Sequence, residues 1–138
     1  MEFHRGRLID HIQLRCTDLA ASKRFYAAVL SVFGRELTEL TPSLVYADEL
    51  CLSPANTDPS SRIHLAFQTT SREEVDRFHA AAIGAGGRDN GKPGERPYHP
   101  GYYAAFVLDP DNNNVEAVYH GEAVRSAASV VITPKLPS

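Results

Sequence analysis

The first clearly patterned stretch of the chain is LIDHIQLRC, residues 8–16, in which apolar and polar side chains alternate. Alternation with a period of two is typical of a β-strand that is buried on one face only. One face carries mostly apolar side chains, and the other carries His11, Gln13 and Arg15. The pattern therefore predicts a strand over 8–16 with a distinctly polar face.

A helical period replaces this alternation after Asp18, whose side chain favours the N-cap position. Apolar side chains recur at helical spacing through residues 19–32, and Gly34 stands where helices commonly end. Shorter apolar runs then predict three strands, over 35–40, 43–47 and 49–53.

The second half of the chain opens in the same way. RIHLAFQT, residues 62–69, alternates again and carries His64 on its polar face. Ser71 and Glu74 have the spacing of a capping box, which predicts a helix over about 72–83.

The remaining segments are less regular. Residues 88–101 contain three glycines and three prolines and are predicted to form a long loop, which in a compact domain is often a lid or binding loop. Two strands are predicted over 102–108 and 115–120, separated by the turn sequence DPDNNN. In the tail, VVI is interpreted as an edge strand or as a segment that packs on a partner chain.

The two halves are copies of one unit. A shift of 53 positions places Ile12–Leu14 on Leu65–Phe67 and His11 on His64, without a gap over about thirty residues. The first copy is a strand, a helix and three strands, and its duplication predicts an α+β fold of two βαβββ modules within one domain, residues 1–138. The expected boundaries are module one at about 7–53, a linker at about 54–61, module two at about 62–120 and a tail at 121–138.

Composition narrows the class of protein. Hydrophobic residues make up 43% and charged residues 22%, and the formal net charge is −3. A chain without an excess of basic residues is not expected to bind nucleic acid. No run approaches 18 apolar residues, so no membrane partner is expected. Two cysteines without a disulfide framework favour reduced thiols, and the cytoplasm is the expected location.

Three strand residues carry the candidate chemistry: His11, His64 and Glu116. A sheet face lined with such polar groups is a poor core but a good cavity wall. Two imidazoles and one carboxylate suit a divalent Fe, Mn, Zn, Ni or Co ion and leave positions for substrate and water. If the modules pack about a twofold axis, the two histidines converge. The alternative is that all three are ordinary hydrogen-bonded or solvated residues.

The chain resembles the vicinal oxygen chelate superfamily, which includes glyoxalase I, fosfomycin-resistance transferases, bleomycin-resistance proteins and type I extradiol dioxygenases. The resemblance covers residues 8–120 and lies in DHIQLRCTDLAASKRFYAAVL, RIHLAF and YYAAFVLDPDNNNVEAVYH, with Asn112 in place of the usual glycine of the last motif. It implies an incomplete barrel around a cavity, with the helices outside. It also implies His11, His64 and Glu116 as metal ligands, and a homodimer.

The resemblance departs from the four-ligand pattern of glyoxalase I, which takes a further carboxylate from the last strand of module one. The cavity-facing residue there is Cys51 or Leu52 in this chain, and Glu49 comes early for that role. A three-ligand site, as in the thiol transferases and the extradiol dioxygenases, therefore fits better.

The loop PYHPGYY is expected to supply further site residues. His99 or Tyr103 is the candidate for transferring a proton or orienting the substrate. The alternative is that the tyrosines are packing residues whose hydroxyls are hydrated. The expected substrate pocket comprises Gln13, Arg15, Cys51, Gln68, Tyr98 and Tyr102. Basic residues near the loop could attract an anionic substrate or could be solvated surface charges: Arg62, Arg88, Lys92 and Arg96.

Two functions follow from the resemblance. The first is a metal-dependent lyase, transferase or dioxygenase that chelates a small substrate through adjacent oxygens. The second is a metal-free protein that binds and sequesters a small molecule, as bleomycin-resistance proteins do.

Overall fold

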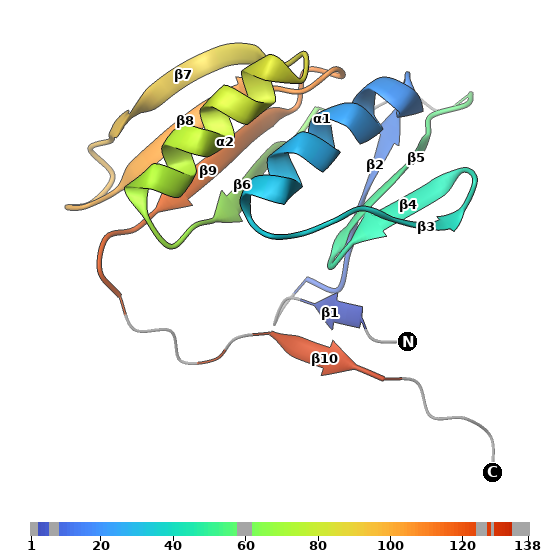
Figure 1. Ribbon diagram of the computed structural model, residues 1–138, viewed down its shortest axis with the longest axis horizontal. Helices are drawn as coiled ribbons and strands as arrows, with labels where there is room; N and C mark the ends of the chain where they lie inside the picture. The colour runs from blue at the N-terminus through green and yellow to red at the C-terminus, as the bar shows by residue number, and fades with distance from the viewer. Residues whose placement is uncertain (1–2, 6–8, 58–61, 124–126, 128, 134–138) are drawn as a thin grey trace.

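The computed structural model describes residues 3–5, 9–57, 62–123, 127 and 129–133. Two βαβββ runs, with one short strand before them and one after, make up this part of the chain (Figure 1). None of its helices is long and apolar enough to cross a lipid bilayer.

Module one forms a mixed sheet covered by one helix. Its strands lie in the order β2-β5-β4-β3, with β2 parallel to β5 and the other neighbours antiparallel. The helix has the bounds that the sequence predicts, whereas the first strand begins at Ile12, later than expected. The elements are β2 (Ile12–Cys16), α1 (Leu19–Val32), β3 (Thr38–Thr41), β4 (Leu44–Ala47) and β5 (Leu50–Pro54).

Module two repeats this arrangement strand for strand, which confirms the predicted duplication. Its order is β6-β9-β8-β7, and β6 runs parallel to β9. Within the described part of the chain, no strand of one sheet pairs with a strand of the other, so the sheets stay open and do not close into a barrel. The elements are β6 (His64–Gln68), α2 (Arg72–Gly84), β7 (Arg88–Glu95), β8 (Tyr103–Leu108) and β9 (Asn114–Tyr119).

Both helices begin at the predicted caps. The Asp18 carboxylate accepts a hydrogen bond from the amide of Ala21 at 3.1 Å. The Ser71 hydroxyl accepts one from the amide of Glu74 at 3.2 Å, and the Glu74 carboxylate reaches back to the amide of Thr70 at 2.7 Å. These bonds satisfy amides that have no partner within the first helical turn.

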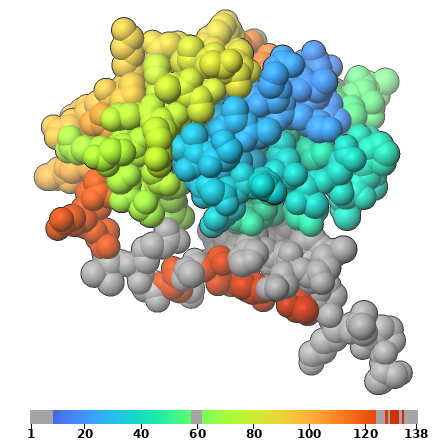
Figure 2. Space-filling model, viewed as in Figure 1, coloured from blue at the N-terminus to red at the C-terminus, as the bar shows by residue number. Residues whose placement is uncertain are grey.

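One apolar core lies beneath both helices. The helices α1 and α2 lie side by side on the same side of the two sheets (Figure 1), and in the space-filling view they form a continuous surface (Figure 2). The Phe33 ring, at the end of α1, stacks on Phe78 of α2 at 6.2 Å and lies 5.4 Å from Phe67 of β6. The helices therefore cover one face of each sheet, and chemistry must be sought on the other.

The turn sequence DPDNNN also links the modules. The buried Asp109 carboxylate accepts hydrogen bonds from the amides of Asp111 and Asn113 and from the Tyr26 hydroxyl of α1. Asp111 in turn accepts a 2.6 Å bond from the Thr17 hydroxyl, just before α1. Asn112 holds a left-handed backbone, with φ of 66°, a conformation that asparagine tolerates better than most residues.

The prediction of a loop over 88–101 is wrong for its first part, because residues 88–95 form strand β7 at the edge of the sheet. Its pairing with β8 shifts register twice, between Asp89 and Gly91 and between Gly91 and Gly94. Pro93 lies within the second irregularity. Edge strands and bulges accept proline and glycine, since a lost N–H or an extra residue there breaks no second ladder.

The two ends of the described chain meet. β1 (Phe3–Arg5) pairs antiparallel with β10 (Val130–Ile132), and together they form a separate two-stranded ribbon. The VVI segment of the tail is therefore a strand, as one of its two interpretations held, although it joins neither of the four-stranded sheets. The linker residues 58–61 lie outside the described residues.

Candidate metal and substrate site

The side of the module-two sheet that faces away from the helices is here called its open face. Leu65 and Phe67 of β6, and Val115 and Ala117 of β9, pack into the core beneath the helices. Side chains alternate along a strand, so the residues between them belong to the open face. It carries His64, Gln68, Phe106, Glu116 and His120, as well as Tyr102, whose hydroxyl contacts Glu116.

His64 and Glu116 form a close pair at the centre of the open face. The His64 Nε2 atom lies 2.6 Å from the Glu116 Oε1 atom. The Glu116 side chain is only 2% exposed, whereas that of His64 is 54% exposed. A buried carboxylate is costly unless hydrogen bonds stabilise it. Here an imidazole holds one carboxylate oxygen, and the ring of that imidazole remains accessible from solvent.

Tyr102 holds the second oxygen of the same carboxylate. Its hydroxyl donates a short hydrogen bond to Glu116 Oε2. Partial burial, then the hydrogen bond and negative charge of Glu116, raise the pKa of Tyr102 to about 12. The phenol therefore stays protonated at neutral pH and remains a donor.

A cluster of aromatic rings surrounds Tyr102. Its ring meets those of Tyr98, His99 and His120 edge-on, with centroids 4.9, 5.3 and 5.2 Å away. His99 Nε2 lies 2.9 Å from His120 Nδ1, and His99 Nδ1 donates to the carbonyl oxygen of Pro100 at 2.9 Å. The structure thus brings the expected site residues Tyr98, His99 and Tyr102 together beside Glu116.

A cavity of about 310 Å³ adjoins this cluster, at the ends of β6 and β9. Gln68, expected in the pocket, lines it together with His120. The other lining residues are Thr69, Thr70, Val118, Tyr119, Gly121, Glu122 and Ala123.

His11 does not join the His64–Glu116 pair. Its exposed ring has Nδ1 2.7 Å from a carboxylate oxygen of Asp10. Among the described residues, no three His, Cys, Asp or Glu side chains lie close enough together to hold a metal ion. The strands β2 and β6 run in opposite directions in Figure 1, so the ends at which they begin, beside His11 and at His64, point opposite ways. The expected convergence of His11 and His64 therefore does not occur within one chain.

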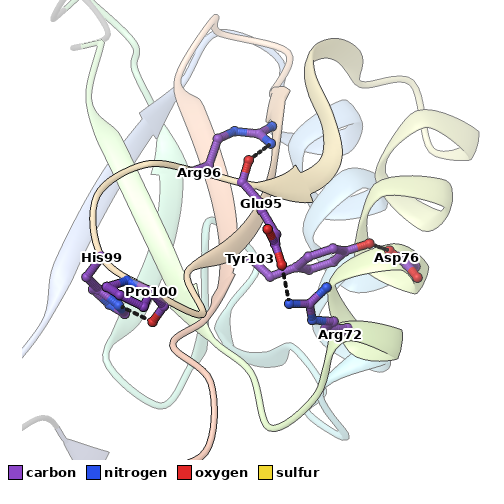
Figure 3. Close-up of polar contacts among 7 residues, drawn as sticks. All are labelled: Arg72, Asp76, Glu95, Arg96, His99, Pro100 and Tyr103. Carbon is purple, nitrogen blue, oxygen red and sulfur yellow. Dashed lines mark hydrogen bonds and ion pairs between the residues drawn. The ribbon is translucent and has the colours of Figure 1, made fainter.

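Tyr103 points away from the open face. Its hydroxyl donates to the Asp76 carboxylate of α2 at 2.7 Å, and the Arg72 guanidinium lies 4.6 Å above its ring (Figure 3). The hydrogen bond to Asp76, then desolvation, raises the pKa of Tyr103. Figure 3 shows this side chain directed toward α2, well apart from His99. Neighbouring strand residues face opposite sides, so Tyr102, and not Tyr103, reaches Glu116.

The module-one sheet carries the remaining pocket candidates. Gln13 donates to the Ser53 hydroxyl at 2.7 Å and lies opposite Cys51 in the β2–β5 register. In module two, Ala66 lies opposite Glu116, and the 53-residue repeat places Gln13 on Ala66. Cys51 is therefore the structural counterpart of Glu116. Leu52 is fully buried in the core, which settles the choice between the two cavity-facing candidates. Arg15 is exposed on the same strand face as Gln13.

Two further residues belong to the open face. The Phe106 ring centroid lies 6.0 Å from that of His64, and the Arg96 guanidinium carbon lies 5.4 Å from the same Phe106 ring. Phe106 was not expected in the site, and Arg96 was only one of four basic candidates. Phe106 belongs to the site because it lies opposite Glu116 in the β8–β9 register. The sequence alone does not reveal this register, so it gave no signal for Phe106.

Comparison with known proteins gives one consistent result. The sequence profile described as Glyoxalase/Bleomycin resistance protein/Dioxygenase superfamily matches residues 8–117. A glyoxalase/bleomycin resistance protein from Albidiferax ferrireducens has a solved structure that is 30% identical, covers 79% of this chain and 95% of its own, and gives a TM-score of 0.67. No curated protein matches the sequence.

Two more distant solved structures share the fold. A glyoxalase/bleomycin resistance protein/dioxygenase family enzyme from Burkholderia phytofirmans is 24% identical over 80% of this chain and 96% of its own, with a TM-score of 0.64. A protein described as lactoylglutathione lyase from Agrobacterium tumefaciens is 24% identical over 82% and 93%, with a TM-score of 0.60. The profile match spans both modules, and the duplicated βαβββ topology agrees with it. The chain belongs to the glyoxalase/bleomycin resistance protein/dioxygenase superfamily.

Proposed function

We propose that this protein is a metal-dependent enzyme in which His64 and Glu116 bind a divalent ion and a small substrate binds through adjacent oxygens. The observation that carries the proposal is the 2.6 Å approach of the His64 imidazole to the buried Glu116 carboxylate on the open face. An imidazole nitrogen and a carboxylate oxygen are donors that Fe, Mn, Zn, Ni and Co accept.

The donor set within one chain is incomplete, because a catalytic metal site in a protein commonly has three protein ligands. His11 supplies the third donor in this proposal, and it does so from a second copy of the chain. Its ring is exposed and is therefore available to a partner. The active unit is then a homodimer with two equivalent sites.

A bound ion would act as a Lewis acid toward the substrate oxygens. The residues around it have separate tasks. Tyr102 fixes the orientation of the Glu116 carboxylate through Oε2, which leaves Oε1 directed toward His64. With both rings of the His99–His120 pair neutral, His99 Nδ1–H donates to Pro100, so His120 Nδ1–H donates to His99. His120 Nε2 then keeps a free lone pair that can accept a proton from a substrate in the adjoining cavity.

The metal content of protein purified without chelators tests the proposal. Wild-type protein should bind about one ion per chain after loading with Zn²⁺, Mn²⁺ or Ni²⁺ and gel filtration, and His64→Ala should lose it. His79→Ala is the matched control, since His79 lies on α2 and bonds to Asp89, on the far side of the sheet. Wild-type protein that retains no metal after loading would contradict the proposal.

A mixing experiment tests the shared site. His11→Ala and Glu116→Gln homodimers should each lack metal, because every site in them has lost one ligand. A mixed dimer, however, contains one site with all three ligands and should regain one ion per dimer. If all ligands came from a single chain, mixing would restore nothing.

The second function is metal-free sequestration of a small aromatic compound. The observation that favours it is the ring cluster of Tyr98, His99, Tyr102 and His120 beside a cavity of about 310 Å³. Tight uptake of an apolar ligand by protein that binds no metal would support this function over the first.

A further inference from the structure

The end of β7 and the residue after it build a fixed position for one guanidinium group. Arg96 donates from one terminal nitrogen to the Lys92 carbonyl oxygen at 2.7 Å and from the other to the Glu95 carbonyl oxygen at 3.3 Å. Its guanidinium carbon lies 5.4 Å from the centroid of the Phe106 ring. Two backbone carbonyls and an aromatic face thus hold a side chain that is usually mobile.

Two glycines make room for this arrangement. A Cβ atom at Gly94 would lie 3.1 Å from one terminal nitrogen of Arg96. A Cβ atom at Gly91 would lie 2.9 Å from the Phe106 ring and 3.3 Å from the other terminal nitrogen. The glycines that suggested a loop therefore form a cradle for Arg96 and Phe106.

The cradle leaves much of the guanidinium unused. Arginine has five N–H donors, and the two carbonyl contacts occupy two of them. No carboxylate in the described part of the chain lies within ion-pair distance of Arg96, in contrast to Arg35 and Arg72, which pair with Asp48 and Glu95. A fixed cation with three remaining donors and no carboxylate within ion-pair distance suits an anion.

The position of the cradle relates it to the candidate site. Phe106 contacts both groups, since the His64 ring lies 6.0 Å from the ring that Arg96 covers. The backbone amide of Arg96 also donates a hydrogen bond to the carbonyl oxygen of Tyr102 at 2.9 Å, which places Arg96 beside the residue that bonds to Glu116. The cation and the His64–Glu116 pair therefore flank one aromatic side chain.

We propose that the Arg96 cradle binds an oxyanion group of the substrate, a carboxylate or a phosphonate, while an apolar part of the same molecule rests on Phe106. The substrate class of the site is then a small organic anion. This inference rests on the proposed function, because it takes the His64–Glu116 pair as the active site, but anion binding itself needs no metal. Anion binding and metal binding can therefore each be disproved without the other.

The test is a titration of metal-stripped full-length protein with benzoate and, separately, with phenylphosphonate. Changes in NMR chemical shifts during the titration give the dissociation constant of each ligand. Benzamide, which has the same ring but no charge, is the ligand control. At least one anion should bind about tenfold or more tightly than benzamide, and Arg96→Gln should remove most of that difference, because hydrogen bonds to charged groups are among the stronger ones. The anion that binds more tightly shows whether the cradle prefers a carboxylate or a phosphonate.

Two further variants separate recognition from general charge. Arg77→Gln removes one positive charge from the exposed surface of α2 and should leave anion affinity unchanged. Gly94→Ala keeps every charge but pushes its methyl group against Arg96, so affinity should fall several-fold while the thermal unfolding midpoint changes little. Equal losses in Arg96→Gln and Arg77→Gln, or equal binding of benzoate, phenylphosphonate and benzamide, would overturn the proposal.

Discussion

The Tyr26 hydroxyl donates a 2.7 Å hydrogen bond to the Asp109 carboxylate, and both residues are almost completely buried. Tyr26 lies on the helix of module one, and Asp109 opens the turn before the last strand of module two. The same carboxylate also orders that turn. One polar contact in the core therefore ties the helix of the first module to the strand that presents Glu116.

Tyr26→Phe should lower the free energy of unfolding by about 1–2 kcal/mol, because Asp109 loses one buried donor while its other bonds remain. Urea denaturation at neutral pH measures the change. Tyr98→Phe is the matched control, since Tyr98 is 67% exposed, and it should change stability by less than about 0.5 kcal/mol. Equal effects in the two variants would contradict the proposed link.

Gly87→Ala and Gly84→Ala should have opposite effects on stability. A Cβ atom at Gly87 would lie 2.5 Å from Val107 and 2.7 Å from Phe25, so the core must shift at a cost of about 1–3 kcal/mol. A Cβ atom at Gly84, the last residue of α2, meets nothing within 4 Å, and alanine there should gain up to about 1 kcal/mol. Thermal unfolding of both variants measures the difference. Similar melting temperatures would exclude the tight approach at Gly87.

Tyr102→Phe should weaken metal binding about tenfold or more, because the Glu116 carboxylate loses the hydroxyl that orients it. Tyr103→Phe removes the same atom one residue farther along, on the other side of the sheet, and should leave metal affinity unchanged. Competition with a metal-binding dye measures both. A loss of affinity in Tyr103→Phe alone would reverse the roles given to these neighbours.

The His79–Asp89 contact should be sensitive to acid. The 2.8 Å hydrogen bond from His79, then the amide of Gly91, lowers the pKa of the Asp89 carboxyl below 3.8. A carboxyl with a lowered folded-state pKa adds stability above its unfolded pKa, and that stability is lost as pH falls through the lowered value. NMR titration should show the Asp89 pKa rising toward its ordinary value in His79→Gln. An unchanged pKa would mean that His79 has no part in the shift.

The helix bounds, and the succession of helices and strands along the chain apart from β7, followed from the sequence because caps and periodicity are local properties. Strand β7 was not predicted because its glycines and Pro93 are normally signals of a turn. An edge strand with two register shifts tolerates both kinds of residue. Gly91 and Gly94 leave room for the Arg96 side chain, and this contact is visible only in the three-dimensional structure.

Site residues were predicted to different degrees for a related reason. The alternation along their strands placed His64 and Glu116 on polar faces, the resemblance to the superfamily named both as metal ligands, and the structure brings them together. The repeat placed His11 in a position equivalent to that of His64, but equivalence within a duplicated chain says nothing about the distance between the two copies. Tyr102 and Tyr103 differ by one residue, and only the register with β9 shows which of them faces Glu116.

The antiparallel ribbon of β1 and β10 has a mechanical consequence. Phe3 lies opposite Ile132, so the first residue of β1 and the last residue of β10 lie at the same end of the ribbon. A force that pulls the termini apart would open its hydrogen bonds one after another, as in a zipper, and not load them together in shear. A tether at either end would therefore peel this ribbon away before tension reaches the sheet that holds His64 and Glu116.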